Sequence, residues 1–191
     1  MIGSHNSWSY LPPKKWWMGL FAFTAKCQSK DIEDQYWRYN VRCFDLRIKM
    51  NGHLDPVVVH NKMEYAITSE ELYTQLYFLN SQKDCWVRVL LDVRCKKQYT
   101  PKQVSQFRNF CAELEERFSH IKFWCGRNLY NWKEDYEFKY SPTCEEEYSS
   151  VCYPKFLDDW WPWLYARLNN KKILKKGTDK DILLIDFVNI K

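Results

Sequence analysis

Short apolar runs alternate with longer amphipathic stretches along this chain. Each run is rich in Val, Ile, Leu and Phe and ends at polar residues, which is typical of strands buried on both faces. The runs cover residues 40–49, 56–62, 85–94 and 181–190, and a shorter one covers residues 120–126. We expect each run to form a strand.

Three stretches between the runs have helical patterns, at residues 68–82, 100–118 and 158–171. The first begins at Thr68 with a glutamate three residues later, and the second begins at Thr100 with a proline directly after it. Both arrangements are typical of helix N-termini. Strands that alternate with helices pair in parallel through crossover connections, so the pattern predicts an α/β sheet or barrel.

The length of 191 residues, of which 46% are hydrophobic and 18% aromatic, allows one sizeable core. Domains typically contain about 100 to 150 residues, so we expect residues 1–191 to form a single domain. The net charge of +5 favours anionic partners, such as phosphate groups, nucleic acid or a negatively charged membrane, without identifying one.

No segment of the sequence has the pattern of an export signal or of a membrane span. The chain leaves no room for a signal peptide before His5, and no apolar run approaches the roughly 18 residues that cross a bilayer. We therefore expect a monomer that is cytoplasmic or peripheral at a membrane surface.

The chain contains eight cysteines, but no two are separated by two residues as a zinc knuckle requires. Five lie in apolar surroundings and are expected to be reduced, buried side chains, namely Cys43, Cys85, Cys95, Cys111 and Cys125. Cys144 and Cys152, in a polar stretch, leave one disulfide open as an alternative.

Titratable side chains stand near the ends of the predicted strands, where a buried strand normally excludes them. They are Asp45, Arg47, His60, Asp92, Arg94 and Asp186. In parallel α/β folds the chemistry gathers at the carboxyl ends of the strands. These residues are therefore candidates for a functional site at one rim.

Five motifs in chain order carry a family resemblance. They are GSHNS (3–7), CFDLRIK (43–49), VVVHNK (57–62), VLLDV (89–93) and LLIDFVN (183–189). In this order they resemble the X-domain of phosphatidylinositol-specific phospholipase C, and most closely its metal-independent bacterial type. The resemblance implies a distorted (β/α) TIM-type barrel. Such barrels typically have about 250 residues, so we expect an abbreviated or incompletely closed one, or a truncated chain.

Cleavage of a phosphodiester requires a base and an acid, and two imidazoles can supply both near neutral pH. The resemblance implies that His5 is the base for the inositol 2-hydroxyl and that His60 is the acid for the diacylglycerol oxygen. The product would be a cyclic 1,2-phosphate. Asp186 would orient the base histidine, and Arg47 would hold the phosphate oxygens.

The resemblance is mixed at the residue after the first histidine. Metal-independent bacterial members usually have Asp there, whereas calcium-dependent members have Asn, as in Asn6 of this chain. If calcium were bound, Asn6, Asp45 and Asp92 would be its ligands. Arg47 stands where a further ligand would lie, and a guanidinium is adverse to a site that needs six to eight oxygens. We therefore expect no metal cofactor, and we expect Asp45 to support His60 in place of the missing Asp.

Two groups of residues are candidates for contacts outside the reaction centre. Glu134 and Tyr136 resemble an acidic-x-Tyr pair that holds inositol, and Asp92 and Arg94 are further substrate candidates. Trp16 and Trp17, within residues 11–23, are expected to contact an anionic membrane surface. The alternative is that these tryptophans pack in the core. The stretch WWPW (160–163) has the same two interpretations.

The leading hypothesis is a phosphodiesterase that acts on a phospholipid or inositol phosphodiester. The same chemistry could also cleave other diesters, including RNA. The basic stripes of a nucleic-acid binder are lacking, so we expect no nucleic-acid partner. A non-catalytic phosphoinositide- or protein-binding module is the competing class. Residues 127–157 show no clear periodicity, and the sequence leaves open whether this segment is a lid, a substrate wall or a partner surface.

Overall fold

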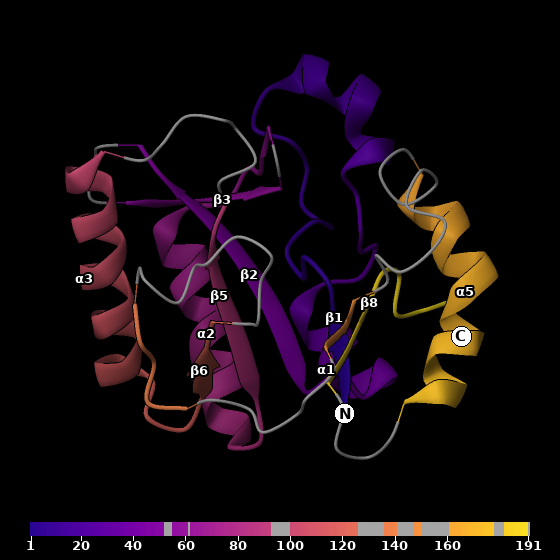
Figure 1. The fold of residues 1–191 in the computed structure, drawn as a ribbon. Coiled ribbons are helices and arrows are strands. Elements are labelled where there is room, and N and C mark those ends of the chain that lie inside the picture. Colours follow the sequence, from indigo (N-terminus) through magenta and orange to yellow (C-terminus); the bar gives the residue numbers. More distant parts are fainter. Residues whose placement is uncertain are drawn as a thin grey trace.

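The computed structural model describes residues 1–51, 55–60, 62–92, 100–125, 136–140, 147–149, 161–177 and 182–190. Its strands are β1 (Ile2–Ser4), β2 (Cys43–Met50), β3 (Pro56–His60), β4 (Met63–Glu64), β5 (Trp86–Leu91), β6 (Lys122–Trp124), β7 (Glu147–Ser149) and β8 (Ile182–Ile185). Helices flank the sheet that these strands form (Figure 1). The predicted α/β class is therefore confirmed.

The long strand β2 organises the sheet. One edge of β2 pairs in parallel with β5, which pairs in parallel with β6. On the other edge its first residues pair in parallel with β1, and β1, β8 and β7 continue the parallel order. In the part of the chain that the structure describes, β6 and β7 end this order and do not pair with each other. The sheet is not closed there, so a TIM-type barrel is not confirmed.

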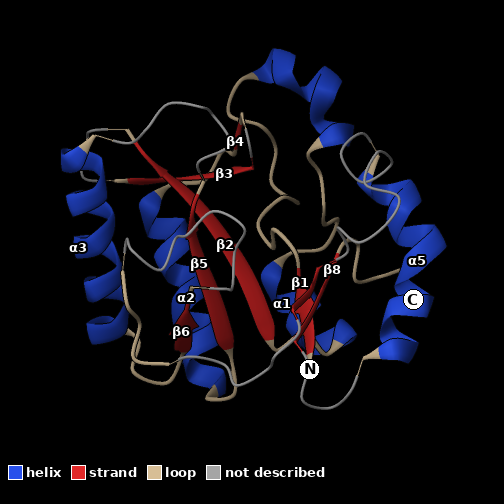
Figure 2. Cartoon of the chain, in the orientation of Figure 1, coloured by secondary structure: helices blue, strands red, loops and turns tan. Residues whose placement is uncertain are grey.

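The strand β3 departs from the predicted parallel pattern. It is antiparallel to the end of β2, with Val58 opposite Ile48 and Pro56 opposite Met50. The reason is the short connection over residues 51–55, since a parallel crossover needs a dozen or more residues. The strand β3 therefore runs back along the end of β2 and ends beside β4, where His60 pairs with Met63 (Figure 2).

The helices are η1 (Trp16–Thr24, a 3₁₀ helix), α1 (Ile32–Tyr39), α2 (Ser69–Gln82), α3 (Pro101–Arg117) and α5 (Pro162–Lys176). Thr68 and Thr100 form the reciprocal N-terminal hydrogen bonds of capping boxes, as their sequences predict. The sequence pattern missed α1, which Asp31 caps by accepting from the N–H of Asp34. Figure 1 shows α2 and α3 beside β5 and β6, and α5 beside β8.

The first strand has only three residues, yet it lies between β2 and β8. Gly3 allows β1 to lie this close to its two neighbouring strands. A Cβ at this residue would lie 2.6 Å from Leu184 Cδ2 and 3.2 Å from Cys43 Cβ. The N-terminal segment is thus fixed by contacts with strands that are distant in sequence. That is how an early residue such as His5 obtains a defined position.

Large apolar side chains fill the core between the sheet and its helices, including Trp8, Phe44, Phe107 and Phe123, none of them more than 1% exposed. Of the expected buried thiols, Cys43, Cys85 and Cys111 are buried and reduced, and Cys125 is half-buried and reduced. Cys95, Cys144 and Cys152 lie outside the described residues. No helix in the described ranges is long and apolar enough to cross a bilayer.

Candidate active site

His5 lies directly after β1 and is held by its backbone. Its N–H donates to the carbonyl of Ile185 at 3.0 Å. The side-chain amide of Gln28 donates to the carbonyl of His5 at 3.1 Å and to that of Ile185 at 2.8 Å. His5 is 5% exposed, and Gln28 is fully buried. These hydrogen bonds connect the ends of β1 and β8, so His5 and Asp186 follow two adjacent strands.

The ring of His5 lies between a carboxylate and a guanidinium. Nδ1 is 2.7 Å from Asp186 Oδ1, and Nε2 is 2.6 Å from Arg47 Nη2. Arg47 has only donors, so Nε2 accepts and the proton of a neutral ring must be on Nδ1, where it is donated to Asp186. This arrangement fixes the tautomer with its lone pair on Nε2, which is the form that a general base requires.

Asp186 is fully buried. Its backbone carbonyl accepts from Asn170 Nδ2 at 2.7 Å, and the same amide donates to the carbonyl of Ile190 at 2.8 Å. Asn170 lies on α5, so this helix fixes the turn that carries the carboxylate. The position of Asp186 relative to His5 therefore depends on α5 as well as on β8.

Beneath this pair, Asp45 binds two arginines. Its carboxylate accepts from Arg47 Nε at 3.0 Å, from Arg88 Nε at 2.9 Å and from the N–H of Asn6 at 2.9 Å. Burial alone would raise the pKa of Asp45, but the two guanidinium groups outweigh it and hold that pKa well below its usual range. The group of Asp45 and two arginines carries one net positive charge.

Arg47 is oriented by its contacts on both sides. Burial disfavours its charged form, yet the carboxylates of Asp45 and Asp92 outweigh that effect and raise its pKa. It is therefore a permanent cation, 9% exposed, in contact with the ring of His5. A planar guanidinium held in this way presents donors to an anionic oxygen.

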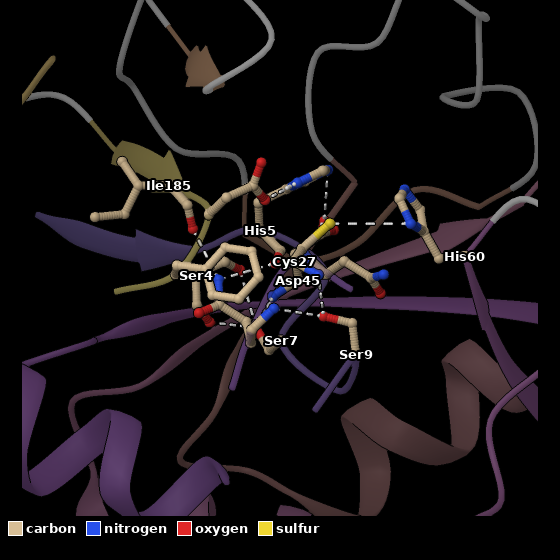
Figure 3. A network of polar contacts seen from close by, with 12 residues as sticks. Ser4, His5, Ser7, Ser9, Cys27, Asp45, His60 and Ile185 are labelled. Atoms are coloured by element: carbon tan, nitrogen blue, oxygen red, sulfur yellow. Dashed lines mark hydrogen bonds and ion pairs between the residues drawn. The ribbon is translucent and has the colours of Figure 1, made fainter. Parts of the chain in front are cut away.

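His60, at the end of β3, brings the second imidazole to the same place. The ring centroids of His5 and His60 are 5.7 Å apart and their planes are perpendicular. His60 Nδ1 lies 2.9 Å from the carbonyl of Ala25, so Nδ1 donates there. Cys27 Sγ is 3.9 Å from the same nitrogen (Figure 3). The site thus contains two imidazoles whose Nδ1 atoms both face acceptors.

The sequence-predicted residues have different outcomes. His5, Asn6, Asp45, Arg47, His60 and Asp186 lie in one connected network, and Asp92 is 6% exposed and close enough to affect Arg47. Tyr136 does not join this network, because its hydroxyl donates to Glu115 on α3 at 2.8 Å and its ring packs on Phe138. Arg94 and Glu134 lie outside the described residues.

The expected support of His60 by Asp45 is not what the contacts show. Asp45 contacts the two arginines and lies 3.9 Å from His5 Nε2, whereas His60 has the carbonyl of Ala25. Asn6 has a positive φ of 44° and donates to Tyr65 at 3.5 Å, so it serves the turn after His5. Asparagine is among the residues that tolerate this conformation.

The calcium alternative fits the donor set poorly. Calcium takes six to eight oxygens, and the fully buried carboxylate of Asp45 is shared by two guanidinium groups. Among the described residues, the three side chains that could together hold a metal ion are His5, Cys27 and Asp186, and Asp45 is not one of them. Those donors include a sulfur and a nitrogen, which calcium does not favour.

Three buried residues of the site were not predicted from the sequence. Arg88 is 4% exposed and is the polar residue in WVRVLL (86–91), so its place in an apolar strand was a usable signal. Gln28 and Cys27 precede α1 in a segment without periodicity, where nothing in the sequence distinguishes them. Their roles come from tertiary contacts only.

Exposed aromatic and apolar side chains gather on η1. Trp16 is 85% exposed, Trp17 47% and Leu20 74%, and Phe21 and Phe23 are also exposed. The core-packing interpretation is thus wrong for these tryptophans. Trp161 and Trp163, at the start of α5, are exposed as well. Figure 1 shows η1 at the top, beyond the carboxyl end of β1, which is the end that carries His5.

No protein-family model and no curated protein matches the sequence. Among solved structures, phosphatidylinositol-specific phospholipase C from Listeria monocytogenes has a TM-score of 0.63 and 12% identity over 98% of this chain and 87% of that chain. The enzyme of the same name from S. aureus has a TM-score of 0.44 and 18% identity over 61% of this chain and 38% of that chain. At these identities the likeness to the Listeria enzyme is one of fold.

Proposed function

We propose that this chain is a phosphodiesterase of the phosphatidylinositol-specific phospholipase C type, built as a single catalytic domain on an abbreviated barrel. The observation that carries the proposal is the pair of imidazoles with centroids 5.7 Å apart, one bound to a carboxylate and to a guanidinium. The fold likeness to the Listeria enzyme gives independent support. The substrate is a phosphatidylinositol-type lipid, and the reaction is attack of its own 2-hydroxyl on phosphorus.

His5 acts as the general base. Its Nε2 lone pair takes the proton of the 2-hydroxyl, and the positive charge that forms on the ring is stabilised by Asp186 at 2.7 Å. In the structure Arg47 occupies this lone pair at 2.6 Å. Substrate must therefore draw the guanidinium onto the phosphate oxygens, which both exposes Nε2 and places a cation against the developing negative charge.

His60 acts as the general acid. Its Nδ1 is anchored on the carbonyl of Ala25, so a protonated ring presents Nε2–H to the departing diacylglycerol oxygen. The O–P bond to glycerol breaks as the bond from the 2-hydroxyl forms, which gives a cyclic inositol phosphate and diacylglycerol. No metal ion is needed in this scheme, because Arg47 and Arg88 supply the positive charge beneath the phosphate.

A membrane provides the substrate, and the exposed side chains of η1 provide the contact with it. Trp16, Leu20 and Phe21 can insert into the headgroup region while Lys14 and Lys15 stay beside anionic lipid. The exposed tryptophans at the start of α5 extend the same contact. Binding of this kind is reversible and positions the site at the lipid surface.

The direct test is turnover of phosphatidylinositol in vesicles with EDTA present, for the wild type, His5→Ala and His60→Ala. We expect water-soluble inositol phosphate from the wild type and a loss of at least about a hundredfold in each variant, since general acid–base groups contribute about 10²–10⁴. Asp55→Asn changes an exposed carboxylate outside the network and serves as the matched control. Lipid binding without product in the wild type would instead support the binding module.

A further inference from the structure

Cys27 lies in the middle of the candidate active site and has no part in the proposed reaction. Its Sγ is 3.9 Å from His60 Nδ1, and the residue is 1% exposed (Figure 3). A ring nitrogen of His5, this sulfur and a carboxylate oxygen of Asp186 all lie within 4.8 Å of one another. Three segments distant in sequence thus bring a nitrogen, a sulfur and an oxygen donor to one point.

The separations of these donors suit a small cation. If all three equalled the 4.8 Å limit, a point equidistant from the donors would lie about 2.8 Å from each, against zinc bonds of about 2.0–2.3 Å. A shift of about half an ångström per side chain therefore completes the coordination. The hydrogen bond between His5 Nδ1 and Asp186 has to open, because a metal ion replaces the proton that these two groups share.

The chemistry of the donors selects the metal. Thiolate and imidazole suit zinc and its soft neighbours, whereas calcium and magnesium prefer oxygen. A thiolate and a carboxylate together neutralise a divalent cation. Arg47 remains paired with Asp45 at 3.0 Å, which limits its repulsion of the bound ion.

We propose that the cluster of His5, Cys27 and Asp186 binds zinc or a similar soft divalent cation and that the bound ion blocks the active site. The ion occupies the base histidine and its carboxylate, so binding and turnover exclude each other. The blocking effect rests on the proposed function, whereas the binding of the ion does not. Cys27 is then the residue that makes this site sensitive to such metals.

Binding is tested with Co²⁺ as a spectroscopic probe on the full chain, after treatment with chelator. We expect a near-ultraviolet thiolate-to-cobalt charge-transfer band that Zn²⁺ removes and Ca²⁺ does not. Cys27→Ser should lose the band, whereas Cys125→Ser, which changes a half-buried thiol outside the cluster, should keep it. A band that survives in folded Cys27→Ser, or no band in the wild type, overturns the proposal.

A second variant avoids changes at the cysteine. Asp186→Asn keeps the thiol but removes one anionic ligand, so Co²⁺ should bind at least about tenfold more weakly. Unchanged Co²⁺ affinity in Asp186→Asn contradicts the assigned ligands, even if Cys27→Ser does not fold. Near-native circular dichroism identifies the folded variants.

The blocking effect is tested by turnover of phosphatidylinositol against Zn²⁺ concentration. Zn²⁺ should inhibit the wild type over the range in which it displaces Co²⁺, whereas the rate of Cys27→Ser, whatever its metal-free value, should not fall over the same range. Equal inhibition of both proteins contradicts the role of Cys27. If the wild type has no turnover at all, the proposed function fails, and the cobalt spectra still decide the metal site.

Discussion

Replacement of Asp186 by Asn tests the carboxylate that we assign to the base histidine. The change removes one charge and almost no volume, at a fully buried side chain whose backbone remains held by Asn170. A hydrogen bond to a charged group contributes about 1.5–3 kcal/mol. Because about 1.36 kcal/mol corresponds to a factor of ten, the loss of this stabilisation should lower kcat/KM about 10- to 150-fold.

A change of the His5 tautomer in Asp186→Asn would increase this loss of kcat/KM. If the new amide turns its NH₂ toward Nδ1, that nitrogen must accept, and the ring proton moves to Nε2. The base then has no lone pair toward the 2-hydroxyl, and losses of about 10⁴ have been produced by such a change in a triad. We therefore expect a decrease of at least about tenfold, with the larger value if the amide takes this orientation.

The assay is kcat/KM for phosphatidylinositol in mixed micelles with EDTA present, with Asp55→Asn as the matched control. Thermal unfolding of Asp186→Asn should show that the fold is intact. Folded Asp186→Asn with wild-type kcat/KM would refute the reasoning, because it would mean that no charge develops on His5 next to this carboxylate.

Three further predictions concern the fold and the surface. Gly3→Ala should lower the free energy of unfolding by about 1–3 kcal/mol, measured by urea titration, because its methyl group would overlap Leu184; unchanged stability would mean that the strand relaxes freely. The pKa of Asp45 lies well below its usual 3.8, so ionised Asp45 stabilises the fold above that pH and this contribution is lost as pH falls below it. The difference in unfolding free energy between wild type and Asp45→Asn should therefore narrow from about pH 6 to about pH 3. A difference that widens over this range would mean that ionised Asp45 does not stabilise the fold. The double variant Trp16→Ala and Leu20→Ala should sediment several-fold less with anionic vesicles, while its turnover of a soluble, short-chain substrate stays unchanged. Equal losses in both assays would show that η1 supports the active site and not only membrane binding.

The sequence predicted most of the secondary structure where periodicity and capping residues agree. Both capping boxes begin helices as expected. The antiparallel direction of β3 was missed because parallel pairing was inferred from the alternation of elements, although the loop over 51–55 is too short for a crossover. The short helix α1 was missed because its eight residues are fewer than the roughly 11 or more over which helical periodicity is recognised.

The site was predicted only where residue types carry chemistry. Asp45, Arg47, His60 and Asp186 stood out because buried strands rarely contain such residues, whereas His5 was identified from the family resemblance. The structure brings these five residues into one network. Cys27 and Gln28 were not found, because their importance lies in contacts with segments far away in sequence. The contact of Asp45 with Arg88 also depends on the register between β2 and β5, which a sequence pattern does not fix.

The division of roles between the two histidines is the central claim, and a substrate with a better leaving group tests it most directly. In a phosphorothiolate analogue of phosphatidylinositol, sulfur replaces the oxygen between phosphorus and glycerol, and a thiolate departs without a proton. The account predicts that this analogue restores cleavage by His60→Ala to nearly the wild-type rate and leaves His5→Ala inactive. Equal rescue of both variants, or rescue of neither, would contradict the assignment of His60 as the acid and His5 as the base.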